Sequence, residues 1–113
     1  MIKDKKNERY YKKNAEKIKE NINKSLWNGN YYSLFYSDGK KHNYFNTAGN
    51  LLAVFWDVAD VKRAKSIEKY IQKFQINKYV PSLTNYPKYP RNLIYPLFYL
   101  IGMQDYHNAG MCW

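Results

Sequence analysis

The sequence has one cysteine, Cys112, and no long apolar run among its 113 residues. A single cysteine excludes an internal disulfide and cannot hold a metal ion by itself. No segment approaches the ~20 consecutive apolar residues of a membrane-spanning helix. The first residues are charged and no apolar segment follows them, which is not the pattern of a signal peptide. We therefore expect a cytoplasmic protein with no membrane contact, and we expect neither a cofactor nor a metal.

Acidic residues are also scarce, since nine Asp and Glu stand beside nineteen Lys and Arg and the formal net charge is +10. Such a balance is typical of proteins that bind nucleic acid. However, four carboxylates interrupt the lysines at the start of the chain, which argues against one continuous basic surface. They are Asp4, Glu8, Glu16 and Glu20. A small basic helical module that binds nucleic acid or an acidic partner is kept as the alternative function, and nucleic acid is the less favoured ligand.

Apolar residues recur at every third or fourth position in two charged segments, which predicts amphipathic helices over 8–27 and 61–74. Between them, segment 48–59 is apolar on nearly every side and predicts a helix that is covered all round. Thr47 is predicted to cap this helix, and Asp60 is predicted to cap the next one, because both side chains accept hydrogen bonds from free backbone N–H groups. The short junction between the helices predicts antiparallel neighbours.

The other segments predict shorter elements. Residues 31–45 are rich in aromatic side chains and contain a turn signal, which predicts a short β-hairpin or an extended loop. Residues 75–92 contain three prolines and predict an irregular segment. Residues 93–101 predict a second buried helix with Pro96 in its first turn. The predicted fold class is all-α, a partial α/α toroid of about four helices in alternating outer and inner order.

The last nine residues gather polar and aromatic side chains on a predicted loop. A carboxylate, a phenol, an imidazole and an amide occupy four consecutive positions, and an indole closes the sequence. Sites for sugars and other polar ligands are commonly built from such loop clusters. The predicted substrate-binding residues are Asp105, Tyr106, His107, Asn108 and Trp113.

Each of these residues has more than one interpretation. His107 is a structural imidazole, a sugar contact or, together with Asp105, a metal ligand; a metal is not predicted because further ligands are missing. Tyr106 and Trp113 stack on a pyranose ring or pack against other side chains. Asn108 binds sugar hydroxyls or shapes the turn that follows it.

Three segments carry a family resemblance. Residues 43–53 read NYFNTAGNLLA, residues 80–87 read VPSLTNYP, and residues 105–110 read DYHNAG. The first resembles the xYFDTAGNLLA signature, and the last resembles the DYHNGGxWPW motif, of six-hairpin glycosidases with an (α/α)6 barrel. These are the amylo-α-1,6-glucosidase (glycogen-debranching) and neutral/alkaline invertase-like enzymes. The resemblance spans roughly Ala15 to Trp113 and covers only part of a full toroid.

This sequence departs from the family motifs at three places. Asn46 occupies the position of the aspartate in the first motif, and Ala109 occupies that of the second glycine in the last. Residues 111–113, Met-Cys-Trp, replace the usual segment around Trp-Pro. Asn46 and Asn50 are predicted to cap backbone rather than to bind ligand. Glycoside hydrolysis requires two carboxyl groups flanking the scissile bond, and no such pair is identifiable, so the catalytic residues are unknown.

The resemblance implies a chain that takes part in carbohydrate metabolism. We expect residues 1–113 to form a single incomplete toroid segment, with 1–7 as a flexible charged tail. This segment would contribute part of a sugar-binding cleft and would not be catalytic alone. The implied partners are an oligosaccharide or disaccharide, and the missing hairpins of the toroid or a second copy. In the lone chain, helices 48–59 and 93–101 are expected to expose apolar sides.

Overall fold

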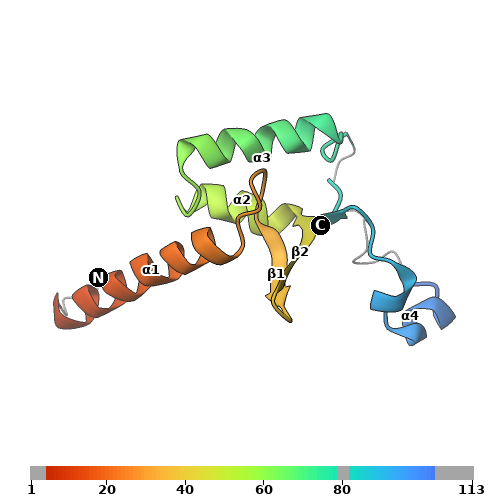
Figure 1. The fold of residues 1–113 in the computed structure, drawn as a ribbon, viewed down its shortest axis with the longest axis horizontal. Helices are drawn as coiled ribbons and strands as arrows, with labels where there is room; N and C mark the ends of the chain where they lie inside the picture. Colours follow the sequence, from red (N-terminus) through yellow and green to blue (C-terminus); the bar gives the residue numbers. More distant parts are fainter. Residues whose placement is uncertain (1–4, 79–81, 104–113) are drawn as a thin grey trace.

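The computed structural model describes residues 5–78 and 82–103 and shows two arms extending from a small body (Figure 1). The first arm is helix α1 (Lys5–Ser25), which confirms the predicted amphipathic helix with both ends shifted slightly toward the N-terminus. Its apolar stripe is buried only at the body, where Ile22 packs against the core. Farther out, Tyr11 and Ile18 are 67% and 59% exposed.

A three-stranded antiparallel sheet follows, made of β1 (Ser33–Ser37), β2 (Lys40–Asn46) and β3 (Asn85–Tyr86) in that order. The turn between β1 and β2 places Asp38 and Gly39 at φ of 50° and 75°. A two-residue hairpin turn of type I′ has this left-handed backbone at both central positions. The predicted hairpin is therefore confirmed, whereas β3 arises inside the segment predicted to be irregular.

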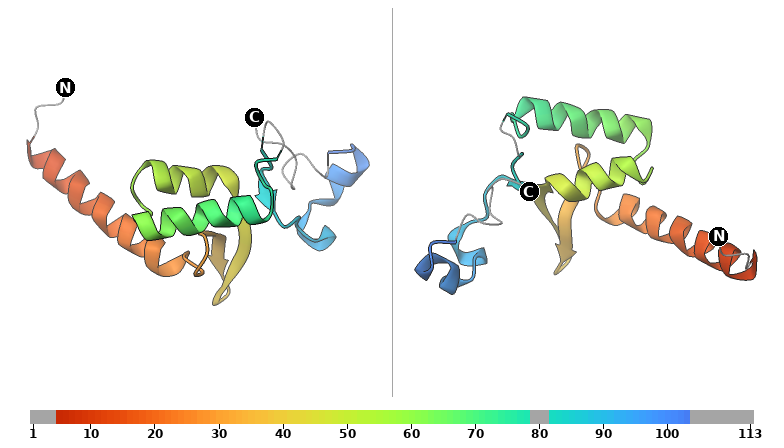
Figure 2. Two further views of the ribbon diagram at one scale, coloured as in Figure 1. Left: turned by 90° about the horizontal axis from the view of Figure 1, so that it is seen from above. Right: turned by 180° about the vertical axis from the view of Figure 1, so that it is seen from behind.

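Helices α2 (Thr47–Phe55) and α3 (Val61–Lys73) form the predicted antiparallel αα-hairpin (Figures 1 and 2). Asp60 caps α3 as predicted, since its side-chain oxygen accepts a hydrogen bond from the backbone N–H of Arg63 at 2.8 Å. The last turn of α1 and the sheet lie beside this hairpin and complete the body.

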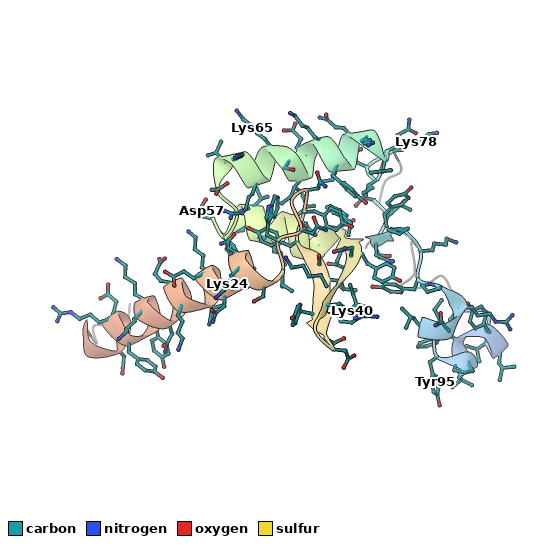
Figure 3. The ribbon with its side chains drawn as sticks, viewed as in Figure 1. Lys24, Lys40, Asp57, Lys65, Lys78 and Tyr95 are labelled. Atoms are coloured by element: carbon teal, nitrogen blue, oxygen red, sulfur yellow. The ribbon has the colours of Figure 1, made fainter. Side chains whose placement is uncertain are left out.

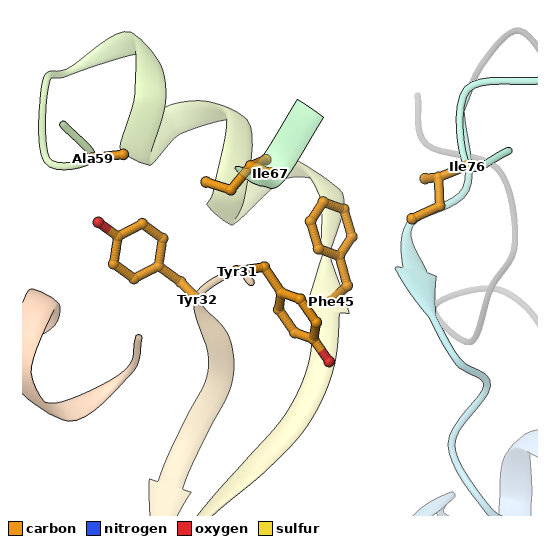
Figure 4. Close-up of a cluster of buried hydrophobic side chains, with 6 residues drawn as sticks. All are labelled: Tyr31, Tyr32, Phe45, Ala59, Ile67 and Ile76. Carbon is orange, nitrogen blue, oxygen red and sulfur yellow. The ribbon is translucent and has the colours of Figure 1, made fainter. Parts of the chain in front are cut away.

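A small core joins the sheet to the hairpin (Figure 4). Phe45 of β2 is 0% exposed, and its ring centroid lies 5.4 Å from that of Tyr31 and 5.2 Å from that of Tyr70. Ile67 brings the apolar stripe of α3 into the same core and is 1% exposed. The buried hydrophobic residues of this core are Tyr31, Tyr32, Phe45, Ala59, Ile67 and Ile76.

The prediction that α2 is covered all round is wrong. Four large side chains on its outer side remain in contact with solvent: Leu51 at 48% exposure, Leu52 at 43%, Phe55 at 77% and Trp56 at 66%. The sheet and α3 cover one side of the helix, and no described element covers the other. The expectation that the lone chain exposes an apolar side of this helix is confirmed.

The prediction of a buried helix over 93–101 is also wrong. The segment holds a 3-10 turn, η1 (Arg91–Leu93), and a five-residue helix, α4 (Pro96–Leu100), which has its proline in the first turn as predicted. Leu100 is 82% exposed. None of the buried core residues comes from this segment, so no packing extends the helix or shields its leucines.

The described residues thus combine four α-helices with a three-stranded sheet. The prediction of a mainly helical chain is confirmed, but the chain is not purely α-helical. The radius of gyration is 16.8 Å, whereas a compact domain of 100 residues has about 13 Å. The excess follows from α1 and α4, which extend away from the body (Figures 1 and 2). The four described helices do not close into a ring. Within the same residues, no helix is long and apolar enough to cross a membrane.

Candidate functional site

The predicted substrate-binding residues lie outside the part of the chain that the structure describes: Asp105, Tyr106, His107, Asn108 and Trp113. Their assignment stays a prediction. The described candidates come from the two other motif segments, 43–53 and the described part of 80–87. The structure brings these two segments together at the start of α2.

Hydrogen bonds fix the start of α2. Asn46 caps the helix, because its side-chain oxygen accepts from the backbone N–H of Gly49 at 2.7 Å. The backbone N–H of Thr47 donates to the carbonyl of Thr84 at 2.9 Å, and the Thr47 hydroxyl donates to the carbonyl of Leu83. The prediction of Thr47 as the N-cap is therefore wrong by one residue, since its hydroxyl bonds the second motif segment instead.

Two buried amides complete this arrangement. Asn50 is 1% exposed; its oxygen accepts from the Tyr32 N–H at 2.8 Å, and its nitrogen donates to the carbonyls of Tyr32 at 3.1 Å and Asn46 at 2.9 Å. Asn85, also 1% exposed, donates to the carbonyl of Pro87 at 3.3 Å. The prediction that Asn46 and Asn50 serve the backbone is confirmed. We call this group the α2 start cluster: Asn46, Thr47, Asn50, Thr84 and Asn85.

A hollow of about 320 Å³ lies beside the α2 start cluster, between α2, β1 and the end of α1. We call it the α2 recess. Leu52, Ala53 and Trp56 contribute to its apolar wall. Asn46 and Asn50 also line it, but their side-chain oxygens already accept hydrogen bonds from the backbone. Trp56, which is 66% exposed, is the largest exposed side chain of the wall. The recess offers a flat apolar contact, which suits the C–H face of a sugar ring, and no acid or base.

The described carboxylates do not form a catalytic pair. All of them are exposed and none lines the α2 recess: Glu8, Glu16, Glu20, Asp38, Asp57, Asp60 and Glu68. The hydrogen bond from the Arg63 backbone N–H holds the pKa of Asp60 below its usual value, whereas the general acid of a glycosidase needs a raised one. The described residues also contain no group of three or more His, Cys, Asp or Glu that could hold a metal ion.

One phenol of the core, that of Tyr32, donates a hydrogen bond to α1. Burial raises the pKa of Tyr32, whose hydroxyl donates to the side-chain oxygen of Asn23 at 2.7 Å. Asn23 in turn donates to the carbonyl of Val58 at 2.9 Å, which ties α1 to the junction between α2 and α3. Sequence reasoning missed Asn23; its only signal was an amide next to the apolar stripe of α1.

A family model described as trehalase matches residues 1–89. The chain belongs to the trehalase family. This family of glycoside hydrolases lies in the six-hairpin glycosidase superfamily, so the resemblance drawn from the motifs is confirmed at that level. The match does not test the more specific assignment to the glycogen-debranching and invertase-like enzymes. The matched range includes the α2 start cluster and ends before the 105–110 motif. No curated protein and no solved structure matches the chain.

Proposed function

We propose that this trehalase-family chain forms part of a sugar-binding cleft and does not hydrolyse glycosidic bonds on its own. The family match over residues 1–89 carries the proposal. The ligand is an oligosaccharide or disaccharide, and trehalose is the first to test because the family is named for an enzyme that acts on it. The exposed, scattered carboxylates of the described residues support the absence of independent hydrolysis.

Two parts of the chain are proposed to contact sugar: the predicted terminal residues and, among the described residues, the α2 recess. Asp105, His107 and Asn108 would bond sugar hydroxyls, and Tyr106 and Trp113 would stack on the ring. The α2 start cluster would hold the wall of the cleft in place. The expected compartment remains the cytoplasm.

The proposed architecture is a partial α/α toroid of the six-hairpin type, glycogen-debranching or invertase-like at the finer level. Other hairpins would cover the apolar surfaces that Phe55 and Leu100 leave exposed in this chain. Exposed apolar patches of several hundred Å² commonly mark such missing contacts. Hydrolysis would then require the catalytic carboxylates of those hairpins.

A thermal melt with trehalose, maltooligosaccharides and sucrose tests the binding role. Ligand that binds only the native state at a hundredfold excess over its Kd raises stability by about 2.7 kcal/mol. One sugar should raise the Tm of the parent, and His107→Ala or Asn108→Ala should abolish the shift without lowering the unliganded Tm. Asn92→Ala, an exposed amide outside the proposed cleft, is the matched control. A melt that responds to none of the sugars contradicts the binding role, and glucose release by the chain alone contradicts the absence of catalysis.

A second candidate function is binding of nucleic acid or an acidic partner. It is favoured by the exposed Lys12, Lys13 and Lys17 on the projecting half of α1. Duplex DNA would then raise the Tm, and the shift would collapse as salt increases because phosphate contacts release counterions. Sugar binding would hardly respond to the same change in salt.

A further inference from the structure

The sequence contains a single Asn-Gly step, Asn28-Gly29, in the loop that joins α1 to the sheet. In Figure 3, Lys24 marks the last turn of α1, from which this loop leads to β1. Because glycine has no Cβ, its backbone nitrogen is open to close approach by the side chain before it. An asparagine in that place is exposed to attack on its own side-chain carbonyl, so the step is a candidate site of covalent change.

Two backbone donors hold the side-chain carbonyl of Asn28. Its Oδ1 accepts a hydrogen bond from the N–H of Asn30 and another from the N–H of Tyr31, both at 3.0 Å. Donors on a carbonyl oxygen draw electron density from the carbon and stabilise the oxyanion that forms when a nucleophile adds. The folded loop thus gives Asn28 a pair of donors of the kind that acyl-transfer enzymes use.

The nucleophile and the leaving group are also available. Gly29 is exposed, and within the described residues no hydrogen bond occupies its N–H. The Nδ2 group of Asn28 donates one long bond, to Oδ1 of Asn43 at 3.3 Å, in an exposed position. Asn50 is the opposite case, since it is buried, bonded through both side-chain atoms and followed by Leu51. The same side chain is therefore reactive in the loop and protected in the body.

We propose that the folded loop activates Asn28 for spontaneous deamidation. The Gly29 nitrogen loses its proton to water and bonds to Cγ of Asn28. The Cγ–Nδ2 bond then breaks, and Nδ2 takes up a proton from water and leaves as ammonia. Water opens the resulting five-membered imide at either carbonyl: opening at the side-chain carbonyl gives aspartate, and opening at the backbone carbonyl gives isoaspartate. Sugar binding plays no part in these steps.

Isoaspartate should loosen α1 from the sheet. It adds one methylene to the main chain inside a loop that two backbone bonds close. The Asn28 N–H donates to the carbonyl of Tyr31 at 3.1 Å, and the Ser33 N–H donates to the carbonyl of Leu26 at 2.9 Å. A longer main chain displaces at least one of these bonds. Aspartate keeps the length of the backbone and both acceptor positions, so it should leave the loop intact.

Peptide mapping by mass spectrometry tests the proposal on folded protein aged at pH 8. The tryptic peptide 25–40 should gain about one dalton at Asn28, and an isoaspartyl methyltransferase should label it. Asn30 lies in the same peptide, is not followed by glycine and has no such donor pair within the described residues. It is the internal control and should react at least about tenfold more slowly.

Two glycine variants separate the step from the fold. Gly29→Ala should slow the reaction at Asn28 at least about tenfold, because a Cβ hinders the approach of the nitrogen and disfavours the φ of 105° that shapes the loop. Gly39→Ala is the matched control: this glycine also has positive φ and open space around it, and its loss should leave the rate unchanged. An unchanged rate in Gly29→Ala, with folding checked by circular dichroism, contradicts the proposal.

Aging the parent in guanidinium chloride removes the donors but keeps the Asn-Gly step. Asn28 should react faster in the folded chain than in the unfolded one. An equal or slower reaction in the folded chain overturns the proposal, because the loop then does not activate Asn28; a first reaction at another asparagine also overturns it. The aged protein should have a lower Tm than fresh protein, whereas Asn28→Asp should melt close to the parent. Equal Tm for aged and fresh protein would contradict the loosening of α1.

Discussion

Two isoleucines on regular helical stripes have opposite surroundings in this molecule. Ile67 of α3 is 1% exposed in the central body, whereas Ile18 of α1 is 59% exposed in the first arm. The helices form in both places because the periodicity and the helix-forming residues are alike. Burial requires a second apolar surface, and the described chain provides one for α3 but, in α1, only for the last turns around Ile22. The pattern of a helix therefore says which face is apolar and does not say what covers it.

Hydrogen bonding likewise distinguishes the body from the second arm, which holds η1 and α4. In the body, side chains cap both α2 and α3, and the buried Asn50 bonds the backbone on both sides of Tyr32. In the second arm, neither η1 nor α4 has a side-chain cap. The body is thus specified by polar as well as apolar contacts, whereas the described elements of the second arm have no side-chain caps.

The largest predicted effect uses the two isoleucines as a matched pair. Ile67→Ala should lower the free energy of unfolding by about 2–5 kcal/mol, because it leaves a cavity in the core. Ile18→Ala should change it by less than about 0.5 kcal/mol, since the side chain is exposed and alanine favours the helix. Urea unfolding of dilute protein measures both. Equal losses for the two variants would show that α1 is packed along its whole length.

The second prediction compares two amides. Asn50→Ala should cost about 2–3 kcal/mol, because it leaves the N–H and carbonyl of Tyr32 buried without partners. Asn92→Ala, on the exposed η1 turn, should cost less than about 0.5 kcal/mol. The same urea titration distinguishes them. If Asn50→Ala were neutral, the α2 start cluster would not hold the body together.

The third prediction concerns alkaline pH. Burial, followed by the hydrogen bond with Tyr31, raises the pKa of Tyr70 above its usual 10.0. The neutral phenol is then favoured in the folded state, so its contribution is complete below pH 10 and is lost as the pH rises through the higher folded pKa. Tm measured from pH 8 upward should fall less steeply for Tyr70→Phe than for the parent. Parallel curves would show that Tyr70 is solvated.

The smallest effect is expected at acid pH. The pKa of Asp60 lies below its usual 3.8, first because the Arg63 backbone N–H bonds the carboxylate. Its stabilising contribution is therefore full above pH 3.8 and is lost as the pH falls through the lower folded pKa. Asp60→Asn keeps a capping side chain but loses the charge, so its Tm should lie slightly below that of the parent at neutral pH and decline less below pH 4. An unchanged acid slope would exclude Asp60 as a contributor.

Local signals predicted the elements whose causes are local. Three of them could be predicted because each depends on residues close in sequence: the Asp38–Gly39 turn, the Asp60 cap and the apolar stripe of α3. The strand β3 was missed because its pairing with Asn46 joins residues almost forty positions apart, which no local pattern encodes. The helix predicted at 93–101 is shortened to α4 because its apolar residues have no described surface to pack against.

The candidate site also has local features that the sequence predicted and tertiary contacts that it did not. The amide roles of Asn46 and Asn50 followed from their places around a helix start. The joining of segments 43–53 and 82–87 at the α2 start cluster depends on tertiary hydrogen bonds, such as Thr47 to Thr84, and was invisible in either segment alone. The ligand contacts predicted for 105–113 lie outside the described residues and stay predictions.

Amide hydrogen exchange at a concentration where the chain is monomeric tests the contrast between body and arms most directly. The account predicts strong protection at the Tyr32 amide, which donates to buried Asn50, and along α3. It predicts rapid exchange over 8–18 and over α4. Protection of 8–18 equal to that of α3 in the monomer would contradict it, because the first half of α1 would then be folded against a surface within its own chain.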